Sequence, residues 1–301
     1  MCIVVAKYFK GTGWVAVKNR DQDYVPDIVF RDKPDKNVDE ILVLYDKNTK
    51  YSEGMNNKEL CIITTSLTPI IADETDAADG KKIDNALRCK TPQEAADYLI
   101  KNKLHGNIFI FNKEELILVE ASADDTHEYE YVKRLVPKTE AVARTNHGIE
   151  ISWAGFQYGV NEKQDFYRKS SETRLKLAQT YVKNSSTPKE MIDGLAKKLI
   201  KDLQLNSFRV ATKPRQMRTV CQMMYVPSKH TMYIRPVQCN MTIETDKRHL
   251  KHELLDDTLK VIKPYDGAMK HHLKIIEKPD GTIKSTFEHK IIKSFTEYLN
   301  E

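Results

Sequence analysis

Runs of β-branched and aromatic residues, broken by short polar segments, fill the first half of the chain. The first two runs, residues 2–9 and 14–21, are joined by Lys10-Gly11-Thr12-Gly13. Two such runs around a short loop that contains glycine are typical of a β-hairpin. The same pattern predicts further strands at residues 27–30, 41–45, 60–65, 108–111, 116–120, 127–136 and 141–145.

Apolar residues recur at helical spacing in residues 79–89, 91–102 and 162–201. Thr91 and Pro92 mark the start of the second helix, because threonine is a good N-cap and proline suits the first helical position. Residues beyond this region predict strands at 219–226 and 231–237, a helix at 250–262 and a hairpin at 275–289.

Strands and helices are grouped along the chain rather than alternating, which predicts an α+β fold with mainly antiparallel sheets. Gly54-Met55-Asn56-Asn57 predicts a turn between two strands. The sequence contains no internal repeat of useful period and no long linker, so residues 1–301 are expected to form a single domain.

The composition indicates which broad classes of protein fit this chain. Hydrophobic residues make up 40% and charged residues 30% of the chain, as expected for a folded protein with a charged surface. The 48 basic and 43 acidic residues are too evenly matched to indicate nucleic acid as a partner. No apolar run is long enough to cross a membrane and no signal segment is visible. Five scattered cysteines without a CxxC pair predict a reducing, cytoplasmic location.

The register of the opening hairpin decides which side chain faces Cys2. If Phe9 pairs with Trp14, Cys2 lies opposite Asp21, with about 4.5–5.5 Å between their Cβ atoms. A slip of one residue brings Arg20 to the face of the thiol instead. In either register a thiol, a guanidinium and a carboxylate gather at one end of a sheet.

Cys2 is small enough for the initiator methionine to be removed. Its α-amino group would then be free, with a pKa of about 7.7–8.0, close to that of an efficient general base at neutral pH. One residue would supply both nucleophile and base, as in N-terminal nucleophile hydrolases. The alternative is that Cys2 is a small buried residue that begins a core strand.

Four motifs follow Cys2 in order. They are Asn19-Arg20-Asp21, Gly54-Met55-Asn56-Asn57-Lys58, Ala143-Arg144-Thr145-Asn146-His147 and Ser170-Ser171-Glu172-Thr173-Arg174. With them the sequence resembles the linear-amide carbon–nitrogen hydrolases of the N-terminal nucleophile type, which include choloylglycine hydrolase, penicillin V acylase and enzymes like acyl-coenzyme A:6-aminopenicillanate acyltransferase. The first residues also resemble the NRDE-motif family. The resemblance to the linear-amide hydrolases extends to about residue 175. Glu59 stands where the usual GMNEKG turn has a glycine.

The resemblance implies a four-layer αββα fold and an amidohydrolase that cleaves a linear amide through an acyl-enzyme on Cys2. It implies that Asp21 orients the α-amino group and that Arg20 lies in an electropositive shell around the thiol. By the same likeness Asn146 contributes its amide to the oxyanion hole, and Arg174 completes the charge network.

The candidate substrate-binding residues are Ser66, Tyr24 and His147, with a backbone N–H near Ser66 as the second oxyanion donor implied by the family. We expect a small-molecule amide substrate and no metal or organic cofactor, nucleic acid or membrane, and we leave a homo-oligomer open. An acyltransferase or dipeptidase of the same fold, or a catalytically silent binding protein, remains an alternative.

Each motif also has a purely structural interpretation. Arg20 and Asp21 could form an exposed ion pair at the end of a hairpin, Asn146-His147-Gly148 could be a plain turn, and Arg174 could lie on a solvated helix face. His249, His252 and Glu253 share one face of the helix predicted at 250–262. This set lacks the second histidine of HExxH, so a charged surface helix explains it better than a zinc site.

Overall fold

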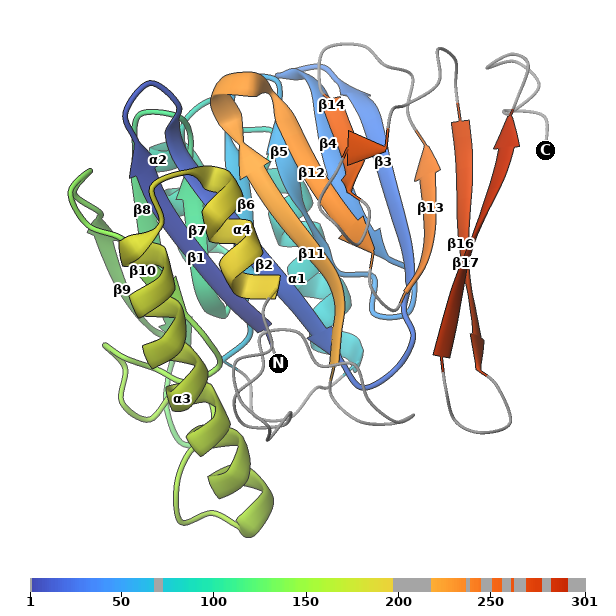
Figure 1. Ribbon diagram of the computed structural model, residues 1–301. Helices are drawn as coiled ribbons and strands as arrows, with labels where there is room; N and C mark the ends of the chain where they lie inside the picture. The colour runs from blue at the N-terminus through green and yellow to red at the C-terminus, as the bar shows by residue number, and fades with distance from the viewer. Residues whose placement is uncertain are drawn as a thin grey trace.

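The computed structural model describes residues 2–67, 73–196, 218–236, 239–244, 251–255, 261–262, 269–277 and 283–291, which form two stacked sheets with helices outside them (Figure 1). The order of strands in the first sheet is β10 (Val142–Arg144), β1 (Cys2–Phe9), β2 (Gly13–Gln22), β11 (Arg218–Val226), β12 (Thr231–Pro236), β14 (Lys251–Leu255) and β15 (Val261–Ile262). The order in the second is β17 (Ile283–Ile291), β16 (Met269–Glu277), β13 (Asn240–Glu244), β3 (Asp27–Asp35), β4 (Asp39–Asp46), β5 (Ser52–Asn56), β6 (Cys61–Thr65), β7 (Gly106–Phe111), β8 (Leu116–Ser122) and β9 (Glu130–Leu135).

Most described strand pairs are antiparallel, while β12 with β14 and β13 with β3 are parallel. The predicted α+β class and the mainly antiparallel pairing are therefore confirmed. No helix in the described ranges is both long and apolar enough to cross a bilayer.

The core lies between the two sheets. Trp14 and Tyr225 of the first sheet and Phe109 and Phe111 of the second are fully buried in one cluster. Because side chains alternate along a strand, the other face of each sheet needs its own cover. Helices α3 (Glu162–Asn184) and α4 (Pro188–Ala196) pack on the first sheet, and α1 (Asp73–Ala86) and α2 (Pro92–Lys101) pack on the second.

The opening hairpin forms, but in the alternative register. Cys2 pairs with Arg20 and Phe9 with Gly13, so the pairing of Cys2 with Asp21 was wrong. The second strand begins at Gly13, where φ is +85° and a Cβ atom would lie 2.4 Å from the carbonyl oxygen of Lys113. The Thr12 N–H donates to the carbonyl oxygen of Phe9 at 2.9 Å, so the turn has one residue fewer than expected, which shifts every pair.

The expected turn at 54–57 was placed too early. Residues 52–56 form β5, and the turn begins at Asn57. Gly54 is needed inside the strand because a Cβ atom there would lie 2.1 Å from the carbonyl oxygen of Leu42. Glu59 adopts a φ of +69°, so the left-handed turn forms without glycine.

The start of α2 is confirmed, because Thr91 is its N-cap and accepts a hydrogen bond from Glu94 N. The helix predicted at 250–262 was wrong in its described part. Lys251–Leu255 is a strand whose residue Lys251 pairs with Thr231, so an available sheet edge overrides the helical charge pattern. His252 and Glu253 are neighbours in that strand and do not share a helix face, and His249 lies outside the described residues.

The last hairpin is confirmed and is longer than expected, since β16 and β17 pair from Met269–Ile291 to Glu277–Ile283. Its predicted centre at Pro279-Asp280-Gly281 lies outside the described residues. The predicted helical region at 162–201 is two helices, α3 and α4, and residues 197–201 are likewise outside the described ranges.

Candidate active site

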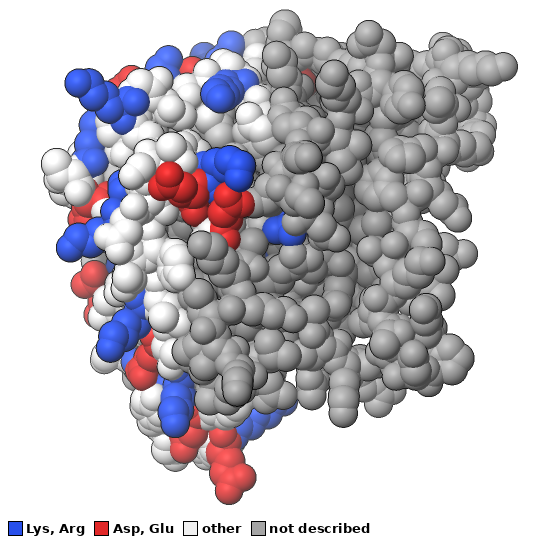
Figure 2. All heavy atoms as spheres, in the orientation of Figure 1, with Lys and Arg blue, Asp and Glu red and all other residues white. Residues whose placement is uncertain are grey.

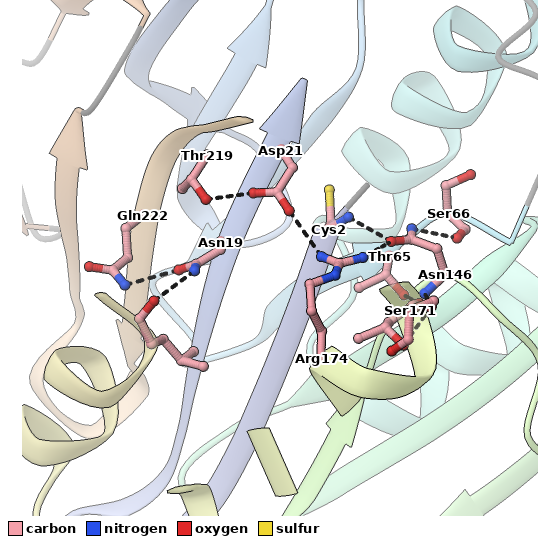
Figure 3. Close-up of polar contacts among 12 residues, drawn as sticks. Cys2, Asn19, Asp21, Thr65, Ser66, Asn146, Ser171, Arg174, Thr219 and Gln222 are labelled. Carbon is pink, nitrogen blue, oxygen red and sulfur yellow. Dashed lines mark hydrogen bonds and ion pairs between the residues drawn. The ribbon is translucent and has the colours of Figure 1, made fainter. Parts of the chain in front are cut away.

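Four of the predicted catalytic residues, Cys2, Asp21, Asn146 and Arg174, converge where β1 begins and β2 and β10 end, beside α3 (Figure 3). The backbone nitrogen of Cys2 donates a hydrogen bond to Asn146 Oδ1 at 2.8 Å. The two residues are 144 positions apart in sequence. The contact therefore depends on β10 pairing with β1, which places the residues after Arg144 next to the first residue of β1.

Arg174 links this contact to Asp21. From α3 it donates to Asp21 Oδ2 at 3.0 Å and to Asn146 Oδ1 at 3.3 Å. Thr219 Oγ1 donates to the other carboxylate oxygen at 2.7 Å. Asp21 and Arg174 are only 3% and 2% exposed, so the interpretation of Arg174 as a solvated helix face was wrong.

Burial sets the electrostatics of this pair. Burial raises the pKa of Asp21, while the positive charge of Arg174 and the hydrogen bond from Thr219 oppose the rise. Burial also lowers the pKa of Arg174, and the Asp21 carboxylate opposes that change. Each group is thus held in its charged form mainly by the other.

Asn146 is held through its backbone as well as its side chain. Its N–H donates to Ser171 Oγ at 2.9 Å, and its side-chain Nδ2 donates to the carbonyl oxygen of Ser66 at 2.9 Å. The preceding carbonyl, of Thr145, accepts hydrogen bonds from Thr65 and Asn107 of the second sheet. Asn146 is only 4% exposed, which excludes a plain surface turn. An amide nitrogen carries two hydrogens, so the bond to Ser66 leaves a second donor available.

The thiol lies on the other face of the first sheet. Directly paired residues share a face, so the Cys2 side chain lies on the same side as Arg20, toward the second sheet. Arg20 donates to Asp46 Oδ2 at 2.6 Å, lies 3.7 Å from Glu53 Oε1, and is only 3% exposed. The partner of Arg20 is therefore Asp46, and the alternative interpretation, an exposed ion pair of Arg20 with Asp21, is wrong.

Lys18 completes a buried ion cluster between the sheets. Its Nζ lies 2.6 Å from Glu53 Oε2. We call Lys18, Arg20, Asp46 and Glu53 the inter-sheet ion cluster. Two positive and two negative charges balance within it, so the charge of Arg20 is largely neutralised by its own partners.

The predicted substrate-binding residues occupy different positions around this centre. Tyr24 donates to Asp46 Oδ2 at 3.0 Å at the edge of the inter-sheet ion cluster. His147 is buried, and its Nδ1 lies 2.7 Å from Ser171 Oγ. Burial lowers the pKa of His147 to about 4, so the ring is neutral at pH 7. Ser66 contributes its carbonyl to Asn146, and its side chain is exposed. Binding of substrate by these residues stays a prediction.

The sequence did not indicate several residues that build the site. Thr219 and Asp46 lie outside every motif, and only folding brings them to Asp21 and Arg20. Ser171 lies inside the Ser170–Arg174 motif, one helical turn before Arg174, which is the only signal that could have identified it.

No model of a known protein family matches the chain, and no curated protein matches it in sequence. Within the described ranges, no group of three or more His, Cys, Asp or Glu side chains is close enough together to hold a metal ion. On the face shown in Figure 2, basic and acidic side chains of the described residues are interspersed.

Proposed function

We propose that this protein is an N-terminal nucleophile amidohydrolase that cleaves a linear amide C–N bond through an acyl-enzyme on Cys2. The observation that carries the proposal is the 2.8 Å contact between Cys2 N and Asn146 Oδ1. That nitrogen becomes the α-amino group once Met1 is removed. The two sheets between outer helices also agree with the four-layer αββα fold that such enzymes have.

The charge balance on the two faces of the sheet favours the amine as the activator of the thiol. A guanidinium lowers the pKa of a nearby thiol only as far as its charge is not already compensated. Asp46 and Glu53 compensate Arg20, and Asp21 compensates Arg174. The α-amino group is attached to the same residue as the thiol, and Asn146 Oδ1 fixes its position.

The reaction then proceeds in two steps. The α-amine accepts the thiol proton, and the thiolate forms a C–S bond with the amide carbonyl carbon. The negative oxygen accepts a hydrogen bond from Asn146 Nδ2, a contact that strengthens as charge develops. The ammonium returns the proton to the leaving nitrogen as the C–N bond breaks, and water hydrolyses the thioester with the amine again acting as base. No metal or organic cofactor takes part.

The burial of Cys2 favours the second candidate, a binding protein that retains the fold without catalysis. Cys2 is only 9% exposed, which is also what a core cysteine would show. An acyltransferase or dipeptidase would use the same first step and differ only in the acceptor or the substrate.

The test is covalent labelling with iodoacetamide, read by intact mass and by peptide mapping. We expect loss of Met1 and preferential labelling of Cys2. Burial raises the pKa of Cys61, Cys89 and Cys221, so these thiols hold little thiolate at neutral pH. Cys89 is the matched control, because it is a half-buried cysteine in the connection between α1 and α2. Labelling of Cys89 in preference to Cys2 would support the binding protein.

A further inference from the structure

A buried carboxylate anchors the loop that follows Asn146. Glu120, on β8 of the second sheet, is 1% exposed. Its Oε1 accepts hydrogen bonds from three consecutive backbone N–H groups, those of Ile149, Glu150 and Ile151, at 2.9, 2.9 and 2.7 Å. Arg144 lies 3.8 Å from the other carboxylate oxygen. A single side chain from the second sheet thus holds the backbone of a loop that leaves the first.

The same loop folds back onto Asn146. The carbonyl oxygen of Asn146 accepts the N–H of Phe156 at 3.1 Å, and His147 forms an isolated bridge with Gly155. Gly155 has a φ of +78°, and a Cβ atom there would lie 2.5 Å from the Asn146 carbonyl oxygen. Because residues 147–155 contact Asn146 this closely, a shift of the loop must also move the Asn146 backbone.

The anchor is a charged group at a place where an apolar residue would leave the loop unsupported. Burial raises the pKa of Glu120, and the three N–H groups and Arg144 oppose the rise. Bonds from backbone N–H to an ionised carboxylate are stronger than neutral ones. Without the carboxylate, the three N–H groups would lose their shared acceptor, and that of Ile151, a buried residue, could reach water only if the loop shifted.

We infer that Glu120 is a positioning residue, which fixes residues 147–155 so that Asn146 stays in place beside the nitrogen of Cys2. Glu120 acts only through the loop and Asn146. Its consequence for catalysis rests on the proposed function, whereas its effect on Asn146 does not. Removal of the anchor should therefore change the environment of the Asn146 side-chain amide even where no turnover is measured.

The test compares variants of Glu120 by NMR of the full chain labelled with ¹⁵N-asparagine, with hydrogen exchange of residues 149–151 followed by mass spectrometry. In Glu120→Leu we expect the Asn146 side-chain signal to shift or broaden and exchange to accelerate about tenfold or more, the change in an opening equilibrium that about 1.4 kcal/mol produces. Glu120→Gln keeps an acceptor oxygen and should restore most of the protection. If the leucine variant does not fold, Glu120→Asp takes its place, because it keeps the charge and withdraws the oxygen by one methylene.

Ser152→Ala is the matched control. It alters an exposed residue of the same loop and should leave the Asn146 signal in place. An unchanged Asn146 signal in folded Glu120→Leu or Glu120→Asp would overturn the inference. If the wild-type chain shows no turnover on any amide, the proposed function fails, while the NMR comparison still decides the role of Glu120.

Discussion

The two faces of the first sheet differ at the point where Cys2 begins it. The face toward the second sheet carries the thiol and the inter-sheet ion cluster, in which Lys18 and Arg20 are neutralised by Asp46 and Glu53. The face toward α3 carries Asp21 and Arg174. Arg174 also donates a hydrogen bond to Asn146 Oδ1, the oxygen that accepts the hydrogen bond from the Cys2 nitrogen.

Under the proposed function, this difference separates charges that support the fold from charges that serve the reaction. The inter-sheet ion cluster pairs charges among its own members, whereas the network on the α3 side ends on the Cys2 nitrogen, which is the amine in the proposed reaction. Buried ion pairs often contribute little to stability compared with apolar packing, although breaking one by removing a partner is costly. We therefore expect changes in the cluster to affect mainly stability, and changes on the α3 side to affect mainly turnover.

The largest expected effect is that of Cys2→Ala. It should reduce turnover on the order of 10⁴-fold or more, because it removes the atom that forms the acyl-enzyme. Thermal melting should stay close to that of the wild type, since the change deletes only a sulfur atom. Rates on a panel of linear amides, with Cys89→Ala as control, measure both. Retained activity in Cys2→Ala would show that Cys2 is not the nucleophile.

Asn146→Ala should have the next largest effect. Loss of one oxyanion donor lowers kcat about 10²–10³-fold and changes KM little, because the contact strengthens only as the oxyanion forms. Steady-state kinetics beside Asn102→Ala, at the C-cap of α2, make the comparison. A normal kcat would assign Asn146 a structural role only.

Two isosteric substitutions compare the faces directly. Asp46→Asn leaves Arg20 without its closest carboxylate and should lower the free energy of unfolding by about 3 kcal/mol, with turnover within about tenfold of the wild type. Asp21→Asn should instead lower turnover by more than this. Urea unfolding and kinetics on both variants provide the measurement. As a control, Asp193→Asn breaks the exposed pair with Lys189 and should cost about 0–0.5 kcal/mol. A larger loss of turnover in Asp46→Asn than in Asp21→Asn would contradict the assignment of stability to one face and turnover to the other.

The smallest expected effect is a pH dependence of stability from His147. Burial lowers its folded-state pKa to about 4 from an ordinary 6.5, so the unfolded chain binds more protons between these values. The stability linked to neutral His147 is therefore complete above about pH 6.5 and is lost as the pH falls toward 4. The difference in unfolding free energy between pH 7 and pH 5 should be smaller in His147→Asn. An equal difference in both proteins would show that His147 does not titrate in this way.

The sequence was most informative where chemistry and local pattern agree. The strand runs predicted most of the described strands, and the order of the motifs brought together Cys2, Asp21, Asn146 and Arg174, which do meet. The features that the sequence did not predict depend on contacts between segments far apart in the chain. The strand at 251–255 depends on pairing with the edge of β12. The partners of Arg20 could not be predicted either, because Asp46 and Glu53 belong to the other sheet.

The most direct test of the central claim is whether the amine of Cys2 is required. With Met1 attached, that nitrogen is a planar, almost non-basic amide and cannot accept the thiol proton. Two preparations decide the question, one with free Cys2 confirmed by mass and one with a peptide extension before Cys2. Only the first should turn over an amide, with a rate that rises with pH up to about 7.7–8.0 and then levels off. Equal rates in the two preparations would contradict the account and leave at most an ordinary cysteine hydrolase.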